Sequence, residues 1–107
     1  MEQRKEKRIF GIKNISIIDE GKSHPVTLVN LSRKGISVLS PTVFPTFKEI
    51  EIDMTIDNHP FKVSGSIRWV NENPLKGPPN YKEIGISLLN PPVEFTNRVA
   101  ELYPPEE

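Results

Sequence analysis

The most constraining stretch of this chain is KEIEIDMTI, residues 48–56, in which polar and apolar side chains alternate strictly from Glu49 onward. Its apolar members are three isoleucines and a methionine, and its polar members are mostly carboxylates. Successive side chains of a β-strand point to opposite faces. Strict alternation therefore predicts a strand with one buried face and one solvated face.

Five further segments have the apolar, β-branched composition of strands, and proline-rich stretches separate them. The chain has 11 prolines, and between strands their missing N–H group costs no sheet hydrogen bond. Short strands with turns between them are typical of a barrel or sandwich, and closing the sheet removes its edges. We predict an all-β fold, a six-stranded antiparallel barrel. The expected strands cover residues 9–18, 26–32, 35–40, 48–56, 61–70 and 82–89.

The C-terminal segment has helical periodicity instead. Phe95, Val99 and Leu102 recur at spacings of four and three residues, which places them on one face of a helix. Prolines precede the segment and Pro104 follows it, as is usual where a helix begins and ends. We expect a C-terminal α-helix at about residues 93–103, packed on the barrel or on a partner.

Composition narrows the classes of function. The 107 residues are enough for one domain, and 14 basic residues balance 14 acidic ones. Zero net charge argues against broad attraction to DNA, RNA or anionic membrane. The absence of cysteine excludes disulfides and thiolate metal sites. No apolar run is long enough to span a membrane and no signal peptide is evident, so we expect a cytoplasmic protein without membrane insertion.

Two short polar patterns accompany the expected strands. RKEKR at residues 4–8 has an arginine at each end, and NLSRKG at 30–35 follows after 21 residues, 9–29. Asn30 and Ser32 are two residues apart, so on a strand they point to the same side. Gly35 lies where the chain must turn into the next strand, and glycine there permits a positive φ and leaves room for a ligand. These residues can present several hydrogen-bonding groups in one place.

Taken together, R-x-x-x-R and N-x-S-x-x-G resemble the signature of the PilZ family, the bacterial receptors for cyclic di-GMP. In that family, [D/N]-x-S-x-x-G follows R-x-x-x-R after about twenty to thirty residues, and the two motifs in this order are more specific than either alone. The resemblance covers essentially the whole chain. It implies a PilZ-type β-barrel with a C-terminal helix, cyclic di-GMP as the ligand, and no cofactor, metal or catalytic residue.

The resemblance also implies ligand-binding roles for five residues. Arg4 and Arg8 would hold guanine and phosphate groups, because a guanidinium can bind either in bidentate fashion and can stack on a purine. Asn30 and Ser32 would bond the guanine edge, and Gly35 would shape the turn. Asn30 stands where aspartate is common, and its neutral carbonyl is a weaker acceptor for guanine N–H groups than a carboxylate.

The arginines lie in an N-terminal arm, residues 1–8, ahead of the barrel and helix at 9–107. Because KEKR has nothing apolar to bury, we expect a flexible arm that ligand binding folds across the barrel. An unidentified protein partner would recognise the surface formed by the folded arm and the ligand. The regulated process would be one such as motility or exopolysaccharide output. The alternative is an adaptor of the same fold that binds proteins but not the nucleotide.

Trp69 has two interpretations. Its strand phase matches Phe61, Val63 and Ile67, which predicts core packing and places Arg68 on the wet side. Family members can place an aromatic near the guanine at this strand end, so ligand contact is the other interpretation.

The remaining polar residues suggest structural roles. The alternating carboxylates Glu49, Glu51 and Asp53 predict a solvated face rather than an acid–base pair. His24 and His59 precede prolines and predict turns, because two isolated histidines make no metal site. A barrel that binds single-stranded nucleic acid would need exposed aromatics in a basic groove, but here the aromatics mostly fall in core phase.

Overall fold

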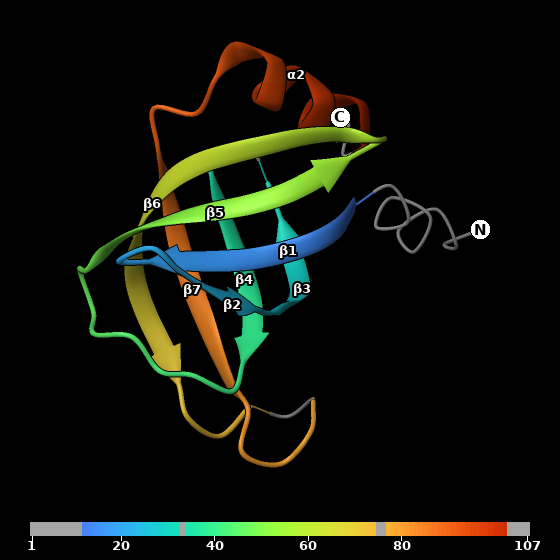
Figure 1. The fold of residues 1–107 in the computed structure, drawn as a ribbon. Coiled ribbons are helices and arrows are strands. Elements are labelled where there is room, and N and C mark those ends of the chain that lie inside the picture. Colours follow the sequence, from blue (N-terminus) through green and yellow to red (C-terminus); the bar gives the residue numbers. More distant parts are fainter. Residues whose placement is uncertain (1–11, 33, 75–76, 103–107) are drawn as a thin grey trace.

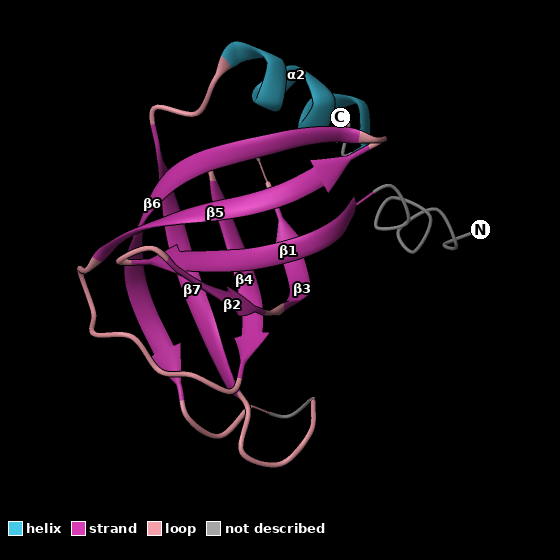
Figure 2. Cartoon of the chain, in the orientation of Figure 1, coloured by secondary structure: helices cyan, strands magenta, loops and turns pink. Residues whose placement is uncertain are grey.

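The computed structural model describes residues 12–32, 34–74 and 77–102. They form one antiparallel β-sheet that curls into a barrel-like shape, with a helix across one end (Figure 1, Figure 2). The expected all-β barrel with a C-terminal helix is confirmed. The elements in chain order are β1 (Ile12–Asp19), β2 (Lys22–Pro25), β3 (Thr27–Leu31), β4 (Gly35–Ser40), β5 (Glu49–Ile56), β6 (His59–Asn71), β7 (Lys82–Leu89) and α2 (Val93–Leu102).

The sheet closes because one bent stretch of chain supplies both of its edges. The strand order is β2-β1-β5-β6-β7-β4-β3, yet β2 and β3 are separated in the chain by Val26 alone. Val26 N donates a hydrogen bond to the carbonyl of Ile15 at 3.1 Å, and β3 continues onto β4. Residues 22–31 thus join β1 to β4, which leaves no long free edge. The expected strand at 26–32 begins earlier, at Lys22, and breaks at Val26, so seven strands are described where six were expected.

Two tight hairpins set the register of the neighbouring strands. Glu20 and Gly21 connect β1 to β2 with φ values of 52° and 81°, and Asp57 and Asn58 connect β5 to β6 with φ values of 50° and 67°. Two consecutive residues with positive φ give a turn whose twist matches that of antiparallel strands. Glycine, asparagine and aspartate tolerate this conformation best, and three of the four residues are of these types.

The alternation in β5 sorts its side chains as predicted. The apolar residues Ile50, Ile52, Met54 and Ile56 are buried, at 4, 0, 2 and 0% exposure. Their polar neighbours lie on the outer face, where Lys62 of β6 approaches Asp53 at 3.2 Å and Glu51 at 3.9 Å. The carboxylate stripe is a solvated face, as expected, and the structure adds a cation from the neighbouring strand.

Helix α2 packs on the barrel. Phe95 and Val99 are fully buried, and the Phe95 ring meets the edge of Phe61 of β6 at 5.6 Å between centroids. Arg98 Nη2 lies 3.1 Å from His59 Nε2, which links the exposed side of the helix to the start of β6. The predicted barrel contact is confirmed for Phe95 and Val99. Within the described residues, no helix is long and apolar enough to cross a membrane.

Candidate functional site

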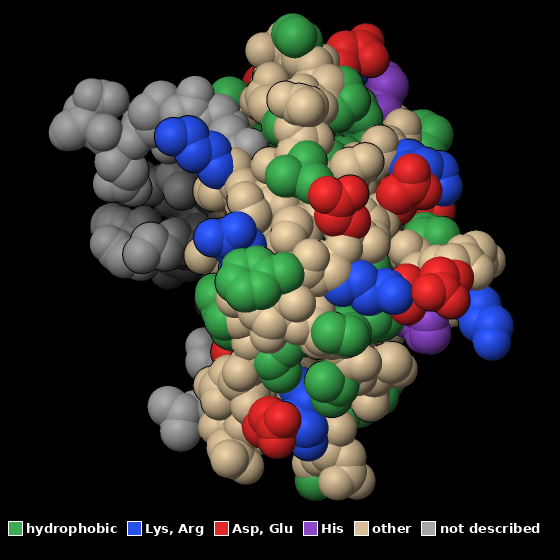
Figure 3. Space-filling view, turned by 90° about the vertical axis from the view of Figure 1, so that its left-hand side faces the viewer, with side chains coloured by type: hydrophobic (Ala, Val, Ile, Leu, Met, Phe, Trp, Pro, Cys, Tyr) green, Lys and Arg blue, Asp and Glu red, His purple; other side chains and the backbone are tan. Residues whose placement is uncertain are grey.

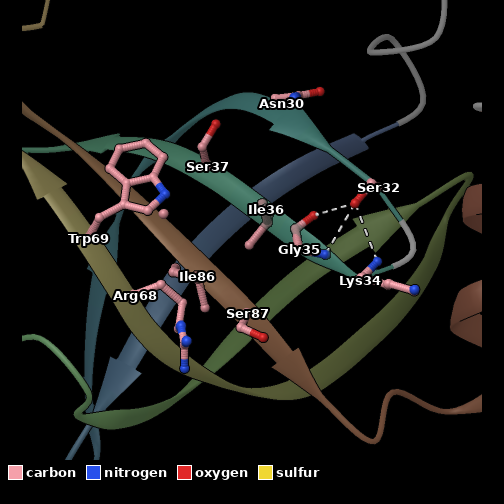
Figure 4. Close-up of a pocket in the computed structure, with 11 residues that line it drawn as sticks. Asn30, Ser32, Lys34, Gly35, Ile36, Ser37, Arg68, Trp69, Ile86 and Ser87 are labelled. Atoms are coloured by element: carbon pink, nitrogen blue, oxygen red, sulfur yellow. Dashed lines mark hydrogen bonds between the residues drawn. The ribbon is translucent and has the colours of Figure 1, made fainter.

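A row of residues crosses four neighbouring strands on the outer face of the sheet. The register pairs Trp69 of β6 with Gly85 of β7, Gly85 with Ser37 of β4, and Ser37 with Asn30 of β3. Figure 4 shows Trp69 at one end of this row, Ser37 between, and Asn30 at the other end. Neighbouring strands lie about 4.8 Å apart, so about 14 Å separates the backbones of Trp69 and Asn30. A planar base has room to lie between them.

Buried side chains of the hydrophobic core lie beneath this row. The next residues along the strands, Leu31, Ile36, Ile86 and Ile67, are paired with one another and point inward at 0–4% exposure. Beyond them, the outer face is floored by Gly35 and Ser87, a pair of small residues. The surface is shallow because the outer side chains are small, and it is rigid because the core beneath it is closely packed.

These residues line a hollow of about 380 Å³, here called the outer hollow (Figure 4). Its lining includes two cations, Lys34 and Arg68, and no carboxylate, so an anionic ligand would meet favourable charge. The lining residues are Asn30, Ser32, Lys34, Gly35, Ile36, Ser37, Arg68, Trp69, Gly85, Ile86 and Ser87. The predicted site residues Asn30, Ser32 and Gly35 are therefore brought together.

Ser32 organises the turn between β3 and β4. Its Oγ accepts hydrogen bonds from the backbone N–H groups of Lys34 and Gly35, at 3.3 and 3.2 Å, and donates to the Gly35 carbonyl at 3.3 Å (Figure 4). The Ser32 N–H also donates to the Gly35 carbonyl, at 2.8 Å. The Lys34 carbonyl accepts from Leu88 N at 2.9 Å, which ties the turn to β7. The hydroxyl thus has a structural role in addition to its exposure in the hollow.

Asn30 points to the same side as Ser32, as predicted, with buried Leu31 between them. A one-residue bulge in β3, between Leu28 and Asn30, sets this phase. The side-chain Oδ1 of Asn30 accepts a hydrogen bond from the backbone N–H of Leu31 at 2.9 Å. A carbonyl oxygen has two lone pairs, so one remains for a ligand N–H group.

The positive φ predicted for Gly35 is wrong. Gly35 begins β4, pairs with Ser87, and does not adopt a positive φ. Glycine is instead favoured here by a close approach of strands, because a Cβ at this position would lie 3.1 Å from the carbonyl oxygen of Ile86. The residue keeps β4 close to β7 under the hollow.

The predicted core packing of Trp69 is also wrong. Val63 and Ile67 point inward as expected, but β6 has one extra residue between Ile67, which pairs with Ile86, and Trp69, which pairs with Gly85. This β-bulge reverses the phase of the strand, so Trp69 is 46% exposed and faces the outer hollow. The adjacent apolar pair Trp69–Val70 was a signal, since only one of two neighbours can face the core.

Arg68, the extra residue of the bulge, is exposed as expected. Its guanidinium carbon lies 5.5 Å from the ring centroid of Phe47, in the loop between β4 and β5. Phe47 is itself 68% exposed, and its backbone N–H donates to the Ile67 carbonyl at 2.6 Å. The stacked ring positions Arg68 at the rim of the hollow, a role that the sequence did not reveal.

Gly85 also contributes to the site, although the sequence did not indicate this. The Trp69 indole lies directly over it, and a Cβ at Gly85 would overlap the ring atoms Cε2, Nε1 and Cζ2. A glycine within a strand often marks a close approach, which is the signal that could have identified it.

Arg4 and Arg8 of the predicted site, and with them the N-terminal arm, lie outside the described residues. The structure therefore describes the barrel side of the expected site.

On the face in Figure 3, basic and acidic side chains are interspersed. Cations and carboxylates also pair on the barrel, where Lys48 Nζ lies 3.3 Å from both Asp19 Oδ1 and Glu20 Oε2. This mixed pattern differs from the basic groove of proteins that bind single-stranded nucleic acid.

Comparison with known proteins gives one family and one similar structure. A family model described as PilZ domain matches residues 2–103. The structure titled "Structure of Bacillus subtilis Inhibitor of motility (MotI/DgrA)" has a TM-score of 0.60 and 11% sequence identity, covering 84% of this chain and 46% of that one. This chain therefore spans about half the length of that protein, and the likeness extends to the fold alone. A search of curated proteins found no match.

Proposed function

Because the chain belongs to the PilZ family, a cyclic di-GMP-binding family of typically non-catalytic receptors, we propose that it is a cyclic di-GMP receptor. The observation that carries the proposal is the outer hollow, in which Asn30, Ser32 and Gly35 of the second motif face Trp69 across the sheet. The hollow suits a purine nucleotide, because small residues form its floor, hydrogen-bonding groups lie on one side and an aromatic ring lies on the other.

Each group has a chemical role in the proposal. Asn30 Oδ1 accepts from a guanine N–H group, and Trp69 stacks on a guanine ring. Arg4 and Arg8 reach from the arm to guanine and phosphate oxygens, with the bidentate geometry that lysine lacks. Ser32 and Gly35 hold the turn between β3 and β4 together, so that the Lys34 side chain faces the ligand.

Signalling follows from ordering of the arm. Ligand binding folds residues 1–8 across the outer hollow, and a protein partner recognises the composite surface. The similar Bacillus subtilis structure is titled an inhibitor of motility, and regulation of motility is a candidate output for this chain as well. Exopolysaccharide output is the other candidate.

Isothermal titration calorimetry with cyclic di-GMP tests the proposal, with GMP as the specificity control. We expect saturable binding that Arg8→Ala abolishes and Arg8→Lys weakens strongly, because lysine keeps the charge but loses the bidentate contact. Lys7→Ala is the matched control, since it removes a cation from the same arm without touching the motif. Equal affinity in Arg8→Ala and the wild type would overturn the residue assignment, and absence of wild-type binding would overturn the receptor.

The second candidate is an adaptor of the PilZ fold that contacts proteins without the nucleotide. One observation favours the adaptor. Asn30 stands where aspartate is commoner, and its Oδ1 already accepts a hydrogen bond from Leu31 N at 2.9 Å, so it has less capacity to accept from a guanine. Asn30→Asp distinguishes the two. A receptor should bind cyclic di-GMP more tightly with the added charge, whereas an adaptor should remain unable to bind it.

A further inference from the structure

We propose that Gly85 is a positioning residue for the nucleotide, because its missing side chain lets the Trp69 indole lie flat enough on the sheet to serve as a stacking platform. The inference rests on the proposed function. It concerns a different residue and a different question, namely what holds the aromatic in place before the ligand arrives.

Two independent features of the fold bring Trp69 to this position. The bulge at Arg68 turns the side chain to the outer face, and the register then places it opposite Gly85. Any residue other than glycine at position 85 would have its Cβ inside the volume of the indole, where the overlap involves Cε2, Nε1 and Cζ2. The ring therefore packs directly on the backbone of β7.

Packing on backbone restricts the ring while leaving it accessible. Trp69 remains 46% exposed, so the indole is covered on one side and open on the other. The next residue across the sheet from Gly85 is Ser37, whose small side chain leaves the path from Trp69 to Asn30 clear. A platform that is already oriented loses less conformational entropy when a base stacks on it.

The substitution Gly85→Ala tests this directly. Trp69 is the only tryptophan of the chain, so fluorescence emission reports on this ring alone. We expect Gly85→Ala to displace the indole into solvent, which shifts its emission to the red and increases quenching by acrylamide in the free protein. We also expect the affinity for cyclic di-GMP to fall about tenfold, within the range of a lost base–aromatic stack.

The double variant Gly85→Ala/Trp69→Ala keeps the test decisive if the single variant folds poorly. When the new methyl group clashes with the indole, removing the indole relieves the clash. The double variant should then unfold at a higher temperature than Gly85→Ala. Gly85→Ala should also cause no further loss of affinity in the Trp69→Ala background, because the two residues act through one contact.

The outcomes separate this inference from the proposed function. If the wild type does not bind cyclic di-GMP, the receptor is refuted, and the emission shift and the double variant still decide whether Gly85 positions Trp69. If the wild type binds and Gly85→Ala binds equally well with unchanged emission, the receptor stands and the role of Gly85 is refuted. Additive losses in the double variant would also refute it.

Discussion

Replacing Trp69 by alanine should destabilise the protein less than replacing its smaller neighbour Ile67. In a regular strand both side chains would enter the core, and the larger tryptophan would dominate. The bulge at Arg68 separates them: Ile67 is 0% exposed, whereas Trp69 is 46% exposed and rests on Gly85. The comparison of Trp69→Ala with Ile67→Ala therefore tests the register itself.

The magnitudes follow from the buried areas. A fully buried tryptophan removes about 200 Å² from water, so the covered half of Trp69 accounts for about 100 Å². At about 25 cal/mol per Å² this is an upper value of about 2.5 kcal/mol, and a compact denatured state lowers it to about 1.5–2 kcal/mol. Ile67→Ala loses its whole buried side chain and leaves a cavity, for about 3–4 kcal/mol.

Urea denaturation followed by far-UV circular dichroism measures both free energies of unfolding, since Trp69→Ala removes the fluorescent probe. Isothermal titration calorimetry on the folded variants then measures their affinity for cyclic di-GMP. Trp69→Ala should weaken cyclic di-GMP binding about tenfold and Trp69→Phe much less, whereas Ile67→Ala should leave affinity near the wild-type value. A larger loss of stability for Trp69→Ala than for Ile67→Ala would refute the outward orientation of the ring.

Two further predictions concern the frame around the site. Gly35→Ala should lower the free energy of unfolding by about 1 kcal/mol, because its Cβ would press on the Ile86 carbonyl at 3.1 Å; a raised melting temperature would contradict this. Hydrogen bonds to Glu20 and Asp19 raise the pKa of Lys48 above its ordinary 10.5, so its stabilising effect is complete below that pH and is lost as pH rises through the folded-state pKa. The difference in melting temperature between the wild type and Lys48→Gln should shrink above about pH 10.5, and a constant difference would argue against the ion pairs.

Much of the fold could be read from the chain because its signals are local. The alternation in β5 predicts which of its side chains are buried, and the stripe of Phe95 and Val99 predicts the face of α2 that packs on the barrel. The spacing of Asn30 and Ser32 predicts that both face one side of β3. Each of these depends on residues within one element, where backbone geometry alone decides the direction of a side chain.

The failures occur where a strand meets its partners. Strand periodicity placed Trp69 in the core, and a single extra residue opposite β7 placed it outside. Similarly, Gly35 was expected to need a positive φ, whereas its actual constraint is the carbonyl of Ile86 on another strand. A bulge or a close approach depends on two segments at once, so neither segment contains the information by itself.

The sequence alone thus determined the type of fold, the buried faces of β5 and α2, and the polar motif at the end of β3, because hydrophobic periodicity and turn preferences act over a few residues. Only the tertiary structure decided that Trp69, Gly85, Ser37 and Asn30 form one row. Register is the physical reason. Hydrogen bonding between distant strands selects which residues stand side by side, and a shift of one position moves a side chain to the opposite face of the sheet.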